Sequence, residues 1–172
     1  MLTMKINVII VLFLLLVSTC TFARTPGEVA VGSVLREATL NGFGGDILRL
    51  SELRGKPLII NVWASWCQPC RAEMGSLDRL FKRYGGKQFN LIGISTDDDR
   101  NAAFYFLMRL GVTFDNYADH KLKMENMLGA NTISLTLLID ANGKVLKKVR
   151  GFQQWDSPET IKMIEAVFGT KL

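Results

Sequence analysis

Two cysteines separated by two residues, Cys67 and Cys70, restrict most strongly what this chain can be. They lie in the stretch NVWASWCQPCRAEM, which begins in the apolar run PLIINVWA and continues into a segment whose apolar residues recur every three or four positions. The continuous run predicts a strand buried on both faces, and the recurrence predicts an amphipathic helix over residues 67–84. The pair is therefore expected where a central strand meets a helix N-terminus, a usual place for a functional site.

This position gives the two sulfurs different expected roles. A helix N-terminus favours negative charge, and C-x-x-C cysteines in this setting have depressed pKa values, so Cys67 is expected to face solvent as a thiolate that attacks a partner disulfide. Cys70, one turn further and more enclosed, would resolve the mixed disulfide, and Pro69 would stiffen the loop between them. Glu73 lies on the same helix face, where it would accept the proton of Cys70 directly or through water; the alternative is an exposed helix glutamate.

Other functions of the cysteine pair are less well supported by the sequence or stay open as alternatives. A disulfide that closes so short a loop removes little unfolded-chain entropy, so it is a poor structural staple. A zinc site needs about four ligands, whereas the chain has a single histidine, His120, far along the sequence. We therefore expect no resident metal or cofactor. A copper(I)-binding or copper-site assembly protein that uses the same dithiol, and an interaction domain with a vestigial pair, stay open as alternatives.

The N-terminus has the layout of a secretory signal peptide. Lys5 precedes an apolar run over residues 6–17, and the stretch STCTFA provides small residues for cleavage after Ala23. This predicts a signal peptide over residues 1–23 and one domain over 24–172. An uncleaved membrane anchor and a lipidated Cys20 stay open, but all three alternatives place the domain outside the cytoplasm, where a disulfide is permitted.

Composition limits the kind of partner. The chain has 172 residues and a formal charge of +5, which fits one globular domain with a mildly basic surface. No dense stripe of Lys and Arg with interleaved aromatic residues occurs, so nucleic-acid binding is not expected.

The remaining segments alternate in character. Strands are expected at residues 34–40, 47–50, 57–64, 89–95, 112–117, 134–140 and 144–151, and helices at 67–84, 100–110, 122–128 and from Pro158 onward. Ser51 is expected to cap a single helical turn that ends at Gly55. Asn142-Gly143 predicts a hairpin between the last two strands. This order predicts an α/β fold in which a central mixed sheet is flanked by helices.

The motif VWASWCQPC at a strand-to-helix junction, after a signal peptide, resembles the thioredoxin-fold proteins. More narrowly, it resembles the TlpA/ResA/DsbE group of extracytoplasmic thiol-disulfide oxidoreductases. The similarity covers nearly the whole mature chain, from GSVLREATLNGFGGDILRLSELRGK to LLIDANGKVLKKVRG. It implies a thioredoxin-like fold with an extra N-terminal strand pair. It also implies that Trp66, directly before the first cysteine, packs beside the dithiol; the alternative is a residue partly buried in the core.

The resemblance also implies an activity. Such proteins act mainly as reductants of disulfides in partner proteins, in the periplasm or on the extracytoplasmic side of the inner membrane. They are kept reduced by a membrane thiol-electron transporter of the DsbD/CcdA kind, and often serve cytochrome c maturation. Asn61 lies six positions before Cys67, where thioredoxin has a buried acid and this group has asparagine. Glu73 matches the glutamate that serves instead in the group, which implies an acid role for it.

One position departs from the group. The fold normally has a cis-proline opposite the dithiol, but here the stretch ANTISLTLLID puts Ser134 at that place. Because a cis bond without proline costs ~3–4 kcal/mol, we predict that the Ile133–Ser134 bond is trans, or cis with visible strain. The hydroxyl of Ser134 is expected near the sulfurs, where it would stabilise a thiolate, slow the release of mixed disulfides or admit a metal ion, unless the serine is simply a tolerated replacement.

Overall fold

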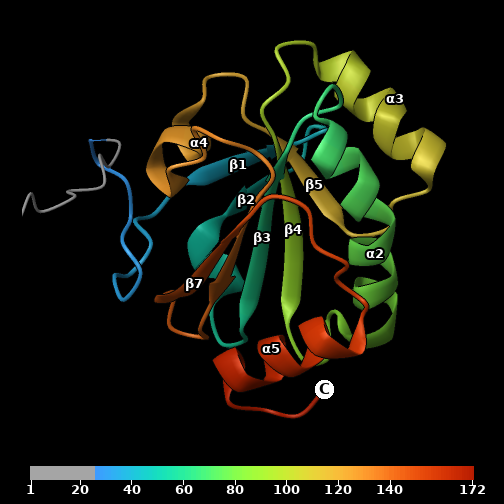
Figure 1. The fold of residues 1–172 in the computed structure, drawn as a ribbon. Helices are drawn as coiled ribbons and strands as arrows, with labels where there is room; N and C mark the ends of the chain where they lie inside the picture. The colour runs from blue at the N-terminus through green and yellow to red at the C-terminus, as the bar shows by residue number, and fades with distance from the viewer. Residues whose placement is uncertain (1–25) are drawn as a thin grey trace, which may run out of the picture.

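The computed structural model describes residues 26–172 (Figure 1). The signal peptide or anchor predicted for residues 1–23 lies outside these described residues, and the predicted domain is described from residue 26 onward. No helix within residues 26–172 has both the length and the apolar character that a membrane span requires.

The core of the fold is one mixed sheet of seven strands in the order β2-β1-β5-β4-β3-β6-β7. Strands β3, β4 and β5 are parallel, whereas β6 is antiparallel to β3 and β1 is antiparallel to β5. The predicted mixed sheet with an N-terminal strand pair is thereby confirmed. The strands are β1 (Thr39–Gly42), β2 (Ile47–Arg49), β3 (Leu58–Trp63), β4 (Asn90–Ser95), β5 (Asp115–Ala118), β6 (Leu135–Ile139) and β7 (Val145–Arg150).

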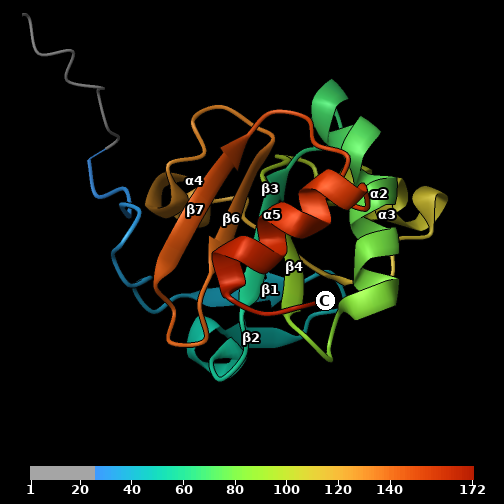
Figure 2. The same cartoon turned by 60° about the horizontal axis from the view of Figure 1, so that its bottom comes forward.

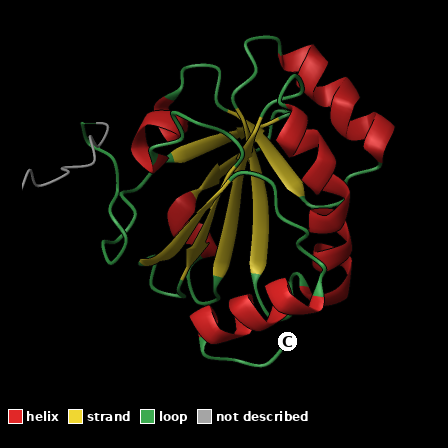
Figure 3. Ribbon diagram, viewed as in Figure 1, coloured by secondary structure: helices red, strands yellow, loops and turns green. Residues whose placement is uncertain are grey.

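Helices flank this sheet, as Figures 2 and 3 show. The helices predicted from Arg100 and from Pro158 begin at these residues, and the side chains of Asp99 and Ser157 before them each accept a hydrogen bond from a backbone N–H of the first turn. The predicted cap at Ser51 is wrong, because the short 3₁₀ turn begins one residue earlier without a side-chain cap. The helical segments are η1 (Leu50–Leu53), α2 (Gln68–Tyr84), α3 (Arg100–Leu110), α4 (Lys123–Leu128) and α5 (Pro158–Phe168).

All six residues of the central strand β3 are buried, and its side chains alternate between two cores. Ile60 and Val62 belong to the core that also contains residues of α4, whereas Ile59 and Trp63 belong to the core that contains residues of α2, α3 and α5. Side chains two positions apart on a strand share a face. Asn61 therefore faces α2, which places a fully buried amide beneath the helix that carries the cysteines.

Gly93, in the middle of β4, is expected to tolerate no larger side chain. A Cβ at this position would collide with the amide oxygen of Asn116, which accepts a hydrogen bond of 2.9 Å from Trp63 Nε1. We expect Gly93→Ala to lower the free energy of unfolding by about 1–3 kcal/mol, measured by denaturant titration.

Gly75 of α2 provides the matched control for Gly93. It is exposed, and a Cβ there would lie in ordinary contact, 3.5 Å from the Arg79 guanidinium. Gly75→Ala is expected to be neutral or to stabilise by up to about 1 kcal/mol. If both variants have the same stability, the close approach at Gly93 does not limit the fold.

Candidate active site

Cys67 and Cys70 form a disulfide at the start of α2. Helix α2 begins at Gln68, one residue after its predicted start, and Cys67 is its N-cap. The Cys70 backbone N–H donates a hydrogen bond of 3.3 Å to Cys67 Sγ, and Pro69 lies in the first turn, where its missing N–H leaves no gap in the helix. The first sulfur therefore lies at the positive end of the helix dipole, where a thiolate is favoured.

The two cysteines are more enclosed than the sequence suggests. Cys67 is 4% exposed and Cys70 is fully buried, so the prediction that Cys67 faces solvent is wrong for the disulfide-bonded form. The alternative that Trp66 is partly buried in the core is also wrong, because its side chain is 68% exposed. Gln68 and Pro69 are exposed as well. The disulfide thus lies just under an exposed loop, and the apolar surface that Trp66 adds lies outside the core.

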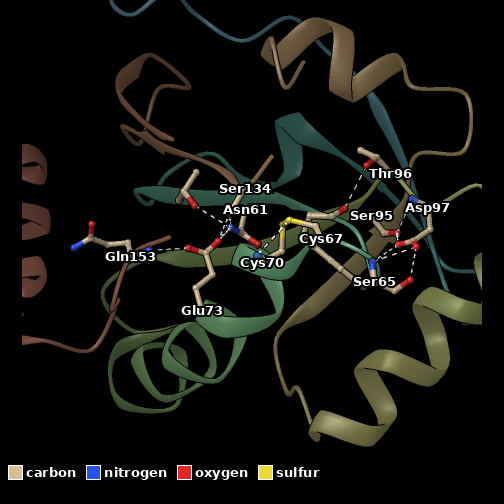
Figure 4. The surroundings of a disulfide bond; sticks show 12 residues. Asn61, Ser65, Cys67, Cys70, Glu73, Ser95, Thr96, Asp97, Ser134 and Gln153 are labelled. Atoms are coloured by element: carbon tan, nitrogen blue, oxygen red, sulfur yellow. Dashed lines mark hydrogen bonds between the residues drawn. A yellow bond between two sulfur atoms is a disulfide. The ribbon is translucent and has the colours of Figure 1, made fainter. Parts of the chain in front are cut away.

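Asp97 anchors the loop that precedes the cysteines. Its carboxylate accepts hydrogen bonds from the Ser65 backbone N–H at 2.9 Å, from the Ser65 hydroxyl at 2.5 Å and from the Ser95 hydroxyl at 2.8 Å (Figure 4). This role of Asp97 is not among the sequence predictions above. Its position directly after a buried strand, at the edge where β3 also ends, is the signal that identifies it.

Glu73 is fully buried, so the alternative of an exposed helix glutamate is wrong. Its carboxylate accepts four hydrogen bonds, and Figure 4 shows three of the donor residues, Asn61, Ser134 and Gln153. Oε1 accepts from Asn61 Nδ2 at 2.9 Å and from the Ser134 hydroxyl. Oε2 accepts from the Gln153 backbone N–H and from Trp155 Nε1, both at 3.1 Å. A buried carboxylate is thus held in one orientation three residues after Cys70.

The surroundings of Glu73 act on its pKa in opposite directions. Burial raises the pKa of the carboxyl above its ordinary value and outweighs the hydrogen bonds from Ser134, Trp155, Asn61 and Gln153, which lower it. In the view of Figure 4, Glu73 lies on the Cys70 side of the disulfide. A buried carboxyl with a raised pKa, one helical turn after Cys70, has the properties expected of a proton acceptor.

The peptide bond between Ile133 and Ser134 is cis, so the prediction of a trans bond is wrong. Spacing along the sequence does not show what Ser134 contacts. The structure adds contacts on both sides of Ser134, since its hydroxyl donates to Glu73 and its backbone oxygen accepts from the Gly151 N–H at 2.8 Å. Ser134 is fully buried at the start of β6.

Two of the groups that hold Glu73 have no signal in the sequence. Gln153 and Trp155 lie in the segment between β7 and α5, about eighty positions after Glu73, and no spacing pattern connects them to it. Within residues 26–172, no group of three or more His, Cys, Asp and Glu side chains lies close enough together to hold a metal ion. The copper(I) alternative stays a prediction that depends on the two sulfurs alone.

A disulfide-bonded C-x-x-C pair at a helix N-terminus, after the central strand of a mixed sheet, is typical of thioredoxin-like proteins. Residues 31–148 match the model of the AhpC/TSA family, and the chain belongs to this family. It is similar to thiol-disulfide oxidoreductase ResA of Geobacillus thermodenitrificans, with 32% identity over 72% of this chain and 71% of the relative. ResA of Bacillus subtilis is 26% identical over 72% and 69% of the two chains.

Solved structures agree with this assignment. The chain resembles the crystal structure of a Chlorobium tepidum protein described as a candidate thiol:disulfide interchange protein DsbE. The TM-score is 0.74 and the identity 28%, and the match covers 81% of this chain and 99% of the other. The protein is accordingly a thiol-disulfide oxidoreductase with a thioredoxin-like fold, and its disulfide-bonded C-x-x-C pair is Cys67 and Cys70.

Proposed function

We propose that the protein reduces disulfides in partner proteins, and that Cys67, Cys70 and Glu73 carry out the reaction. The observation that supports this best is the Cys67–Cys70 disulfide at the N-terminus of α2 with a buried carboxylate three residues further along the helix. In the reduced protein, the helix terminus favours the thiolate of Cys67.

The proposed reaction has two exchanges. The Cys67 thiolate attacks one sulfur of a partner disulfide, which forms a mixed disulfide and releases the first partner thiolate. Cys70 then gives its proton to Glu73, and its thiolate attacks the sulfur of Cys67. The second partner thiolate leaves, the partner has gained two electrons, and the protein is left with the disulfide seen in the structure.

The same proposal includes a place and an electron donor. The signal peptide or anchor predicted for residues 1–23 supports a location in the periplasm or on the extracytoplasmic side of the inner membrane. The resemblance to the TlpA/ResA/DsbE group supports re-reduction by a membrane thiol-electron transporter of the DsbD/CcdA kind. It also supports a role in cytochrome c maturation or a related reduction of thiols.

Insulin reduction together with a measured reduction potential tests the direction of exchange. We expect the reduced protein to cleave insulin disulfides, and Cys67→Ser to have no activity. We expect the potential of the Cys67–Cys70 couple to lie closer to that of thioredoxin, about −270 mV, than to that of DsbA, about −120 mV. A potential near the DsbA value, with oxidation of reduced peptides in place of insulin reduction, would show that the protein is an oxidant.

A further inference from the structure

The accepting positions of the Glu73 carboxylate are all occupied. An ionised carboxylate offers about four lone-pair positions, and two hydrogen bonds reach each oxygen of Glu73. This arrangement suits the ionised form. A proton arriving from Cys70 has no free position on the carboxylate, so one of the donors must turn around before Glu73 can hold it.

The donors on the two oxygens differ in their ability to turn. Oε2 faces the backbone N–H of Gln153 and the indole N–H of Trp155, and neither nitrogen can accept a hydrogen bond. Oε1 faces the Ser134 hydroxyl, which both donates and accepts and reverses by rotation about one bond. The other donor on Oε1, the Asn61 amide, presents an acceptor only if the whole amide turns over. The proton is therefore directed to Oε1.

The same side of the site contains an unused acceptor. Asn61 Oδ1 is buried and has no hydrogen-bond partner among the described residues, and its amide nitrogen lies 3.3 Å from Ser134 Oγ. A reversed Ser134 hydroxyl needs an acceptor for its own proton, because a buried unpaired donor is costly. The Asn61 oxygen supplies one when the amide turns over, because in the structure the amide nitrogen, and not the oxygen, faces Ser134.

We propose that Ser134 is a positioning residue for the proton transfer: its hydroxyl donates to Glu73 Oε1 while the carboxylate is ionised, and reverses to accept when Oε1 takes the proton of Cys70. This inference rests on the proposed function, in which Glu73 receives that proton. No atom or electron is added, since the proton moves from Cys70 to Glu73 while the hydroxyl of Ser134 rotates and the Asn61 amide turns over.

Few charged groups face Glu73. Its hydrogen bonds within residues 26–172 all come from uncharged groups. The nearest ionisable residue along α2 is Arg71, which is exposed and lies over the Phe106 ring, and the two cysteines do not titrate while disulfide-bonded. Two charged residues on neighbouring segments bond elsewhere: Arg150 of β7 donates to the Gly129 carbonyl, and Asp156 pairs with Arg79 on α2. The oxidised protein therefore isolates the titration of Glu73.

The test is the titration of the Glu73 carboxyl carbon by ¹³C NMR in the oxidised protein, with the signal assigned from its absence in Glu73→Gln. Ser134→Ala removes the charge-assisted bond to the ionised form, so we expect the pKa of Glu73 to rise by about one unit. Ser134→Thr keeps the hydroxyl and is expected to bring the pKa back to within about 0.3 units of wild type.

Thr136 provides the matched control. It is a buried hydroxyl two positions along the same face of β6, and it contacts Asn61 at 2.9 Å but makes no hydrogen bond to Glu73. Thr136→Val is expected to move the pKa of Glu73 by less than about 0.3 units. The proposal is overturned if Ser134→Ala leaves the pKa unchanged, or if Thr136→Val raises it equally. If Ser134→Ala does not fold, the Ser134 ¹³Cβ signal of the wild type must titrate together with Glu73, and its failure to do so overturns the proposal.

A kinetic measurement connects this titration to the reaction. In the reduced protein, the pH midpoint for resolution of a mixed disulfide is expected to shift upward in Ser134→Ala by the same amount as the pKa of Glu73. The NMR titration does not depend on disulfide reduction. A wild type that fails to reduce insulin would therefore refute the proposed function, whereas an unmoved Glu73 pKa would refute the role of Ser134.

Discussion

Replacing Cys70 by serine is expected to stop turnover and to leave the protein covalently attached to its substrates. Cys67 keeps its place at the positive end of α2, so the first exchange still forms a mixed disulfide. A serine hydroxyl cannot resolve that bond, and we expect insulin reduction to fall by on the order of 10³-fold or more. The trapped complexes are to be detected as thiol-sensitive adducts on non-reducing gels and identified by mass spectrometry.

Cys67→Ser is the matched control for the trapping experiment. This variant keeps one thiol at the fully buried position 70 and loses the N-cap sulfur, so it should form few or no adducts. Equal trapping by both variants would mean that the two sulfurs do not have separate roles. No adducts from Cys70→Ser in extracytoplasmic extracts would remove the support for exchange with partner proteins.

Much of this fold is encoded locally. The continuous apolar residues of β3 and β4 and the three-to-four spacing of α2 identify these elements because a strand buried on both faces and a half-buried helix need different patterns. The strand predicted from Val34 onward begins only at Thr39. Leu35 is buried but lies outside the strands of the sheet. In the sequence, an apolar residue that packs on the core from a loop looks the same as one that packs from a strand.

The active site, in contrast, can be predicted only in part from spacing along the sequence. The relation of Cys67 to Cys70 and Glu73 is local to one helix, so it can be predicted from spacing. The environment of Glu73 is not local, because its donors come from β3, from the residue before β6 and from the segment before α5. The exposure of Trp66 also depends on the path of a loop fixed by Asp97 from the neighbouring strand end. Contacts of this kind exist only once the sheet is assembled.

Glu73→Gln is expected to slow the second exchange and to leave the first nearly unchanged. The glutamine cannot take the proton of Cys70, and loss of a positioned proton acceptor typically costs 10²-fold or more, so we expect resolution of the mixed disulfide to slow by roughly 10²-fold. Stopped-flow measurement of mixed-disulfide decay, apart from its formation, checks this. Asp78→Asn is the control, since this buried carboxylate of α2 accepts from Thr113 and pairs with Lys82, away from the disulfide.

The same substitution predicts a change in how stability depends on pH. Burial raises the pKa of Glu73 in the folded protein above its value of about 4.5 in the unfolded chain, so between these two values the folded state binds more protons. The contribution of Glu73 to the free energy of unfolding is therefore fully present below its pKa in the unfolded chain. It is lost as the pH rises through its pKa in the folded protein. Glu73→Gln removes this pH-dependent loss of stability. Between the two pKa values, the free energy of unfolding of the oxidised variant, relative to that of the oxidised wild type, should therefore rise with pH.

Two other carboxyl groups also make the stability depend on pH, so the quantity to measure is the difference in the free energy of unfolding between Glu73→Gln and wild type. Burial also raises the pKa of Asp119 and of Glu125, and both give the wild type and the variant the same fall in stability with pH. Glutamine can fit the site if its oxygen faces Gln153 and Trp155 and its amide faces Ser134, because the Asn61 amide can turn to present its unused oxygen. Urea titrations of both oxidised proteins between about pH 4 and pH 8 measure the difference. Parallel curves would mean that Glu73 has the same proton affinity folded and unfolded, and that its four donors fully compensate its burial.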